Sequence, residues 1–250
     1  MLTLGINTAS STTSIALFDC EKNKLKLLKE QSWLSKNDEA DRLMPEIYKL
    51  LGKKHFRFPD IKKIIAVKGP GSFTGLRVGI TVANTMAYLN KCDLFEINSF
   101  ELWWKGFSRS GKKRDAALLI YSGIKGVYAS LFASVTAKNE MIPIDDLDKF
   151  LKKHKIKIVF GDIHKDQKKI IKSAKFFNIK KTFGEIIEKF SLDEITKVTL
   201  INPMYIKSPQ ITPKQSEGLP ANSVSELCER TPCVDNSQRL PIAKNKFFHN

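Results

Sequence analysis

The sequence predicts an α/β fold of two lobes, and three observations support this prediction. Segments with strand-like and helix-like patterns alternate along most of the chain, which is typical of helices packed against sheets. A strand-rich opening occurs twice, once at the N-terminus and again from about residue 116. The length of 250 residues is sufficient for one large domain or for two smaller lobes with apolar cores.

In the first half, the predicted elements are strands at 2–6, 13–18, 25–32, 61–67 and 94–97 and helices at 38–52, 74–90 and 99–107. The strands are apolar or alternating runs bounded by polar turns. The first helix follows from the helical spacing of Leu43, Ile47 and Leu50, with Gly52 at its end. An antiparallel meander of two or three strands therefore opens the fold.

In the second half, the predicted elements are strands at 116–121, 127–135 and 157–160 and helices at 145–154, 165–173 and 182–190. Beyond about Ser208 the chain is rich in Pro, Ser, Asn and Gln, and it has too few apolar residues to offset the entropy of ordering. We therefore predict a first lobe at 1–100, a second lobe at 101–207 whose end can pack back on the first, and a disordered tail at 208–250.

The composition excludes a membrane-embedded protein. Hydrophobic residues make up 42% and charged residues 27% of the chain, and no apolar run approaches the roughly 20 residues of a spanning helix. The N-terminal residues lack the basic region and the cleavage site of a secretory signal, so we expect a cytoplasmic protein without membrane contact. The four cysteines form no C-x-x-C pair, which predicts free thiols.

The formal net charge of +16 permits two interpretations. Clustered Lys and Arg neutralise phosphates, so a direct nucleic-acid-binding module is one hypothesis, and a steep salt dependence of the affinity for nucleic acid would support it. The lysines are spread along the sequence, however, and Arg, the preferred bidentate partner of phosphate, is scarce. We therefore favour a general compositional bias over a dedicated nucleic-acid-binding face.

The glycine-rich turn at 68–78 lies between a predicted strand and a predicted helix. Free backbone N–H groups and the helix dipole favour an anion at such a turn, and Ser72 or Thr74 can cap the helix. A tight structural connection without a ligand is an equally open interpretation. The candidate nucleotide contacts, counting the first polar turn of the chain, are Asn7, Gly69, Gly71, Ser72 and Thr74.

The named catalytic motifs are absent from this turn. Leu76 and Arg77 stand where a Walker A motif needs lysine and a hydroxyl, and Pro70 replaces the first glycine of a nucleophile elbow. No two of the four histidines are four residues apart, so the H-x-x-x-H pair of a helical metal site is missing too. We expect no catalytic residue, no metal and no cofactor of its own.

The helix at 74–90 is apolar on two faces, which exceeds the single stripe of an ordinary surface helix. One face can cover a sheet, and the other must be buried by the helix at 38–52 or by a partner. Gly79 and Ala83, four residues apart, would let a neighbouring helix approach closely. The predicted partner interface consists of Leu43, Ile47, Leu50, Leu76, Arg77, Val78, Gly79, Val82, Ala83 and Met86.

Several segments resemble the TsaB/YeaZ family, and the resemblance spans about residues 1–207. The most specific is the nine-residue block Gly69-Pro-Gly-Ser-Phe-Thr-Gly-Leu-Arg77. The others are residues 1–17, Arg42-Leu-Met-Pro45, Ser99-Phe-Glu-Leu102, Val127-Tyr128 and Pro203-Met-Tyr-Ile-Lys207. The family usually has Asp where this chain has Asn7, and an actin-like enzyme uses that Asp near its metal and nucleotide.

The resemblance implies an actin-like (ASKHA, RNase H-like) fold of two lobes with mixed sheets flanked by helices. It implies a non-catalytic subunit that supports the transferase TsaD, with the ATPase TsaE, in making threonylcarbamoyladenosine in tRNAs that read ANN codons. The two helices of the first lobe would pair with TsaD or with a second copy of the chain. ATP and metal would belong to TsaD and TsaE, and tRNA would be reached through the complex.

One alternative function belongs to a different class. The chain can be a nucleotide-dependent phosphotransferase of the actin-like superfamily, with the turns at 7–13 and 69–74 as phosphate loops. Tight binding of magnesium-ATP would favour this alternative.

Overall fold

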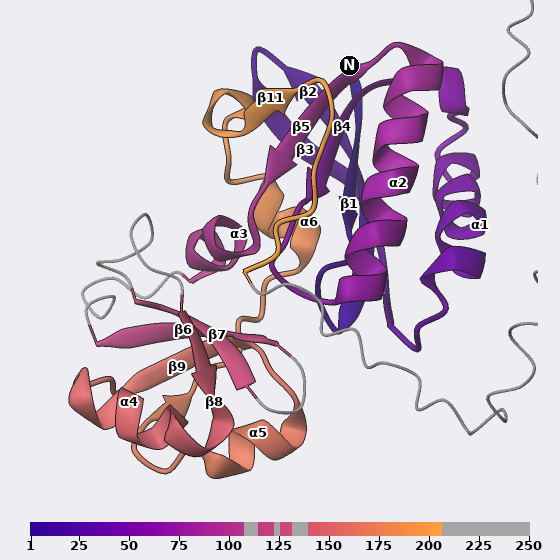
Figure 1. Ribbon diagram of the computed structural model, residues 1–250. Coiled ribbons are helices and arrows are strands. Elements are labelled where there is room, and N and C mark those ends of the chain that lie inside the picture. The colour runs from indigo at the N-terminus through magenta and orange to yellow at the C-terminus, as the bar shows by residue number, and fades with distance from the viewer. Residues whose placement is uncertain (108–114, 123–125, 132–139, 207–250) are drawn as a thin grey trace, which may run out of the picture. The chain divides into compact units, whose positions relative to one another are not determined.

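The computed structural model describes residues 1–107, 115–122, 126–131 and 140–206. All of these residues belong to one compact unit, Met1–Ser208. They form two mixed β-sheets, each flanked by helices (Figure 1). The predicted α/β architecture with mixed sheets is therefore confirmed, whereas the predicted tail lies outside the described residues.

The first sheet has the strand order β11-β5-β4-β1-β2-β3. Its strands are β1 (Leu2–Asn7), β2 (Thr12–Glu21), β3 (Lys24–Leu34), β4 (Ile61–Val67), β5 (Asp93–Ile97) and β11 (Thr196–Val198). Strands β1, β2 and β3 form the predicted antiparallel meander, and β4 and β5 run parallel to β1. Strand β11 was not predicted, because three residues are too few to show a period.

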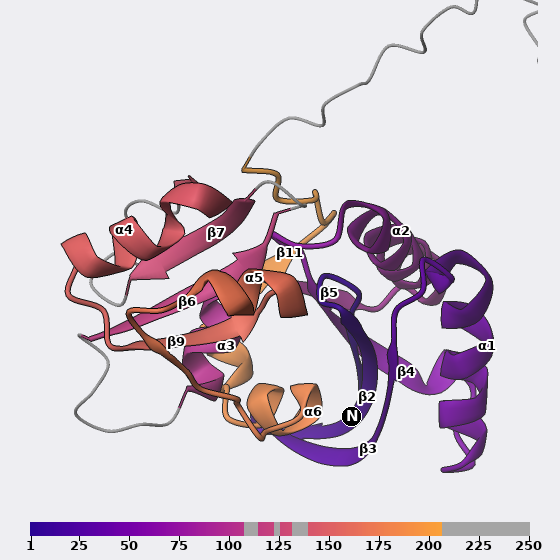
Figure 2. The same cartoon turned by 90° about the horizontal axis from the view of Figure 1, so that it is seen from below.

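Helices cover both faces of this sheet (Figure 2). Helices α1 (Glu39–Gly52) and α2 (Phe73–Asn90) lie on one face, and α3 (Ser99–Gly106) and α6 (Phe183–Ile187) lie on the other. A 3-10 turn, η1 (Phe58–Asp60), precedes β4. The buried apolar stripe of α2 packs against β4, β5 and β1, and that of α1 packs against β2, β3 and α2, as their helical spacing predicts.

The second sheet repeats the arrangement of the first, with the order β10-β9-β6-β7-β8. Its elements are β6 (Ala116–Tyr121), β7 (Gly126–Leu131), β8 (Glu140–Pro143), η3 (Ile144–Asp146), α4 (Leu147–Lys153), β9 (Ile158–Asp162), α5 (Lys165–Ile170) and β10 (Lys175–Phe176). Again three strands form a meander, and β9 and β10 run parallel to the first of them. The repeat predicted from one strand pair therefore extends to the whole sheet.

Two predicted helices extend beyond those of the structure, and one predicted strand is only partly described. The predicted helices at 165–173 and 182–190 end earlier, at Ile170 and Ile187. Of the predicted strand at 127–135, residues 132–135 lie outside the described ranges. The short strands β8 and β10 were missed for the same reason as β11.

Helix α3 contributes to the packing of both sheets. Leu102 belongs to the core of the first sheet, and Phe100 and Trp104 belong to an aromatic cluster on the second. Trp104 Nε1 donates a hydrogen bond to Ser130 Oγ on β7 at 3.1 Å, and Phe107 stacks on Phe160 of β9 at 4.2 Å. The predicted boundary between lobes at residue 100 stays a prediction, since α3 serves both cores.

Candidate functional site

The glycine-rich turn before α2 lies against the turn between β1 and β2. The backbone N–H of Ser72 donates to the carbonyl oxygen of Ala9 at 2.8 Å. A Cβ added at Gly71 would overlap with that same carbonyl, and a Cβ at Gly75 would overlap with the carbonyl of Thr8. These glycines therefore allow two backbone segments to approach each other, which no other residue permits.

Gly79 serves the same close approach one helical turn further along α2. A Cβ at this position would overlap with the side chain of Thr8, which is itself buried. Gly79 therefore permits a close approach, and the segment nearest to it is the chain's own first turn. Helix α1 also packs against α2.

The structure brings the five candidate nucleotide contacts together, and most of them bind other parts of the chain. Asn7 Oδ1 accepts from the N–H of Ala9 at 3.1 Å, and Asn7 Nδ2 donates to Ser10 Oγ at 3.2 Å. Ser72 is the N-cap of α2, as predicted, and its Oγ accepts from the N–H of Gly75 at 3.2 Å. The remaining candidates lie at the same place, where Gly69 is buried, Gly71 half-buried and Thr74 exposed.

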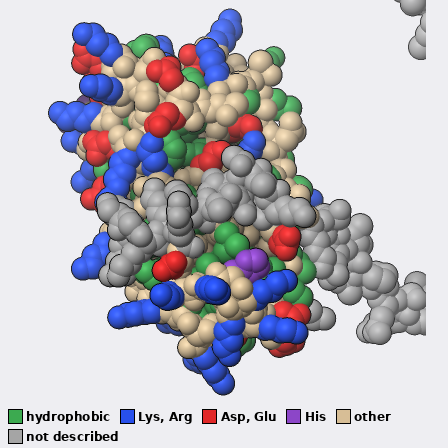
Figure 3. All heavy atoms as spheres, turned by 90° about the vertical axis from the view of Figure 1, so that its left-hand side faces the viewer, with side chains coloured by type: hydrophobic (Ala, Val, Ile, Leu, Met, Phe, Trp, Pro, Cys, Tyr) green, Lys and Arg blue, Asp and Glu red, His purple; other side chains and the backbone are tan. Residues whose placement is uncertain are grey.

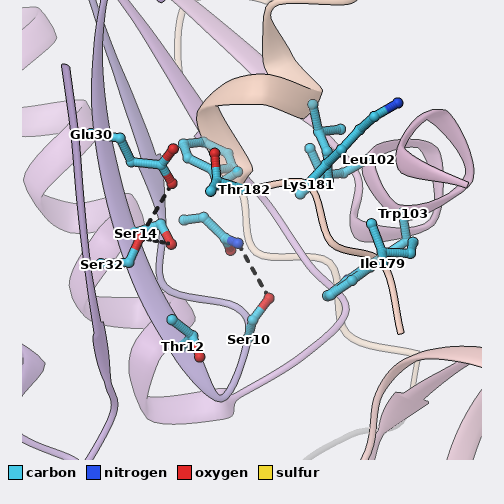
Figure 4. A pocket seen from close by; sticks show the side chains of 13 residues that line it. Ser10, Thr12, Ser14, Glu30, Ser32, Leu102, Trp103, Ile179, Lys181 and Thr182 are labelled. Carbon is cyan, nitrogen blue, oxygen red and sulfur yellow. Dashed lines mark hydrogen bonds between the residues drawn. The ribbon is translucent and has the colours of Figure 1, made fainter. Parts of the chain in front are cut away.

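A cavity of about 260 Å³ lies beside the turn between β1 and β2 (Figure 4). One wall is polar and comes from β1, β2, β3 and this turn, and the other is mostly apolar and comes from α3, α6 and the segment leading into α6. The lining residues are Asn7, Ser10, Thr12, Ser14, Glu30, Ser32, Leu102, Trp103, Ile179, Lys181, Thr182, Phe183 and Ile186.

Part of the polar wall of the cavity is a connected hydrogen-bond network. Ser14 Oγ and Ser32 Oγ are 2.9 Å apart, and Ser32 Oγ donates to Glu30 at 3.2 Å. The second carboxylate oxygen of Glu30 accepts from the N–H of Gly184 at 3.0 Å. This network fastens the start of α6 to β3, so its first role is structural.

Three lysines gather where α3 and α6 meet. Burial, and then the nearby ammonium of Lys181, lower the pKa of Lys189 to about 8. Lys105 is compensated, because its Nζ pairs with Glu194 at 2.8 Å and lies 4.5 Å from the Phe190 ring. Partial burial and the like charge of Lys181 therefore favour the neutral form of Lys189 in the folded state.

We predict that Lys189 is the most reactive lysine of this cluster near pH 8. With a pKa of about 8, about half of its amines are unprotonated at that pH, whereas an ordinary lysine of pKa about 10.4 is almost fully charged. Competitive labelling with limiting acetic anhydride, read by mass spectrometry, measures this difference. Lys181→Gln should slow the labelling of Lys189, and equal labelling of both lysines in the wild type would contradict the prediction.

Most of the predicted partner-interface residues are buried in the chain's own core. Because buried side chains cannot touch a partner, these seven support the surface from below: Leu43, Ile47, Leu50, Leu76, Gly79, Ala83 and Met86. Arg77 is exposed, and Val78 and Val82 are half-buried. The predicted interface is thereby narrowed to the outer faces of the same two helices.

The exposed side chains of α1 and α2 include three large ones that the predicted set omitted. Tyr48 is 61% exposed, Tyr88 is 83% exposed and Leu89 is 70% exposed. Leu89 lies on the second apolar face of the helix, so its signal was present in the sequence, whereas the exposure of the tyrosines depends on packing. We call Met44, Tyr48, Val78, Val82, Tyr88 and Leu89 the α1–α2 surface.

The segment after β11 runs along α2 and is held there by three contacts. Asn84 exchanges two hydrogen bonds with the backbone of Ile201, each 3.0 Å long. Further along, Arg77 Nε donates to the hydroxyl of Tyr205 at 3.3 Å, and the centroids of the Phe73 and Tyr205 rings lie 5.1 Å apart. The flank of α2 next to Asn84 is therefore occupied by the chain itself.

Lysine and arginine side chains are scattered over the face shown in Figure 3, with acidic side chains between them. Within the described ranges, no group of three or more His, Cys, Asp or Glu side chains is arranged to hold a metal ion. None of the helices that the structure describes has the length and hydropathy needed to cross a membrane.

Comparison with known proteins identifies relatives of the chain. The family model described as TsaD, tRNA N6-adenosine threonylcarbamoyltransferase, matches residues 34–202. The protein TsaB of Bacillus subtilis, named for tRNA threonylcarbamoyladenosine biosynthesis, is 31% identical over 134 residues, which are 53% of this chain and 55% of that protein. TsaB of Buchnera aphidicola from Schizaphis graminum is 26% identical over 64% of this chain and 77% of its own length.

The fold is shared with a solved structure. YeaZ from Pseudomonas aeruginosa superposes with a TM-score of 0.58 at 16% identity, covering 82% of this chain and 99% of that one. Together with the repeated strand order of the two sheets, this likeness confirms the predicted actin-like fold class. The aligned part of the Bacillus subtilis relative, however, is only about half of its length.

Proposed function

The chain belongs to the family described as TsaD, tRNA N6-adenosine threonylcarbamoyltransferase, and to its TsaB/YeaZ group, and from this premise we propose that it is a non-catalytic subunit in the biosynthesis of threonylcarbamoyladenosine in tRNA. Its task is to dock on TsaD and to hold that transferase in a competent form. The substrate is the adenosine of tRNAs that read ANN codons, which the chain reaches through the complex.

The α1–α2 surface is the observation that carries this proposal. Tyr88 and Leu89 on α2 and Tyr48 on α1 stand in solvent, and α2 also carries half-buried Val78 and Val82. Contiguous exposed apolar side chains mark protein-binding surfaces, and tyrosine is enriched at their centres. A role in assembly therefore explains why these helices are apolar outside as well as inside.

The packing of the two predicted phosphate loops supports a role without catalysis. The amide of Ser72 and the side chain of Asn7 bind within the protein, and Gly71 and Gly75 are required by the contact between the turns. Phosphate groups would have to displace these contacts to reach the backbone. This arrangement speaks against the alternative of a nucleotide-dependent phosphotransferase.

The remaining chemistry falls to the other members of the complex. ATP and metal are handled by TsaD and TsaE, and the chain needs no cofactor of its own. In the absence of TsaD, the same α1–α2 surface can join two copies of the chain.

Reconstitution tests the proposed function. Purified chain, TsaD, TsaE and the threonylcarbamoyl-adenylate synthase are incubated with tRNA, and threonylcarbamoyladenosine is quantified after digestion to nucleosides. We expect full modification in the complete mixture, background when the chain is omitted, and neither ATP hydrolysis nor modification by the chain alone. Undiminished modification without the chain, or robust turnover by the chain alone, would refute the proposal.

A further inference from the structure

The first turn of the chain is joined to the second sheet by one carboxylate. Asp162, the last residue of β9, accepts two hydrogen bonds from Ser11 in the turn between β1 and β2. The backbone N–H of Ser11 donates to Oδ2 at 2.5 Å, and the Ser11 hydroxyl donates to Oδ1 at 2.6 Å. Short hydrogen bonds to an ionised oxygen are about twice as strong as neutral ones.

The backbone before Asp162 is shaped to place this carboxylate. Gly161 has a φ of +121°, which side chains of other residues rarely tolerate. An added Cβ would also overlap with the carbonyl oxygen of Leu119 on the neighbouring strand. Only glycine permits this bend at the end of β9, so the contact with Ser11 is built into the fold.

The two donor groups of Ser11 lie in a turn that other hydrogen bonds hold in place. The side chain of Asn7, which is 5% exposed, binds Ala9 and Ser10 of this turn, and the backbone N–H of Ser72 donates to the carbonyl oxygen of Ala9. Ser11 therefore presents its N–H and O–H without local rearrangement. A backbone N–H beside a hydroxyl is a donor set that binds carboxylates and phosphates alike.

We propose that Asp162 is an internal anion that fills an oxyanion site in the first turn. The carboxylate takes the donors that a phosphate group would need, and its charge repels a second anion. The same contact acts as a latch between the first turn and the second sheet. When the latch is removed, Ser11 becomes a weak site for inorganic phosphate.

Hydrogen exchange and phosphate titration of the purified chain alone test both parts, and neither measurement depends on TsaD. In Asp162→Ala, the Ser11 amide should exchange at least about tenfold faster than in the wild type, because a strong hydrogen bond to a charged group is lost. Inorganic phosphate is then titrated into each protein while the NMR chemical shifts of the backbone amides are recorded. The shifts should show saturable binding at Ser11 in the variant and none in the wild type.

Two further variants serve as controls. Asp162→Ala combined with Ser11→Ala should lose the phosphate binding, because the hydroxyl donor is gone. Asp166→Ala removes the same charge from exposed α5, where the carboxylate pairs with Lys169, and should leave both measurements unchanged. If Asp162→Ala fails to fold by circular dichroism, Asp162→Asn, which keeps the size of the side chain, takes its place.

Four results would overturn the proposal. They are unchanged exchange of the Ser11 amide in the Asp162 variant, equal phosphate affinity of the wild type and that variant, undiminished binding in the double variant, and a similar gain in Asp166→Ala. The first result would contradict the proposed latch, and the other three would contradict the proposed oxyanion site.

Discussion

Gly75→Ala is expected to destabilise the protein by about 3 kcal/mol, although alanine is the better helix former. The substitution adds one methyl group at the point where α2 approaches the carbonyl oxygen of Thr8. Helix propensity alone favours alanine by about 1 kcal/mol. The overlap is with backbone rather than with the end of a flexible side chain, so either α2 or the first turn must move, and the packing cost exceeds the propensity gain.

Gly52→Ala is the matched control, because Gly52 also lies in a helix and nothing is within 4 Å of an added Cβ there. This variant should be as stable as the wild type or up to about 1 kcal/mol more stable. Urea unfolding of the wild type and both variants gives the two changes in the free energy of unfolding, provided that this free energy depends on the urea concentration with the same slope in all three proteins. If Gly75→Ala unfolds at the wild-type midpoint, α2 does not pack against the first turn in the way described.

The same glycines show what could be predicted from the sequence and what could not. The block at 69–77 predicted a turn and a helix start, and Ser72 was among the expected caps. The segment that approaches is the turn at Thr8, more than sixty residues earlier, and no local pattern identifies it. Likewise, Ser11 and Asp162 are 151 residues apart, and only the placement of β9 beside β6 brings them together.

The secondary-structure elements that could be predicted are those with a clear local pattern. Strand β4 and helix α1 were predicted within a residue, because several apolar side chains repeat with a clear period. The strands β8, β10 and β11 have four residues or fewer and exist because a neighbouring strand offers hydrogen bonds. For α2, the sequence indicated two apolar faces but not which one the chain itself would bury.

Replacing Tyr88 and Leu89 with glutamate is expected to weaken binding to TsaD by at least about 100-fold. Both side chains are mostly exposed on α2, so the change should cost little folding free energy. In a complex, however, each would place a charge in a desolvated apolar contact. Co-purification with tagged TsaD, followed by a titration of the affinity, measures the loss.

The choice of residues separates loss of binding from loss of fold. Met86 also faced outward in the sequence-based prediction, but it is 5% exposed, and a charge there would disrupt the core instead of testing the interface. Ile170→Glu on α5 is the matched control, since it adds a charge at another exposed apolar residue and should leave TsaD binding intact.

If the Tyr88 and Leu89 variant still binds TsaD while circular dichroism shows a native fold, the α1–α2 surface is not the docking site. If it loses self-association but still binds TsaD, that surface joins two copies of the chain, and TsaD must dock elsewhere.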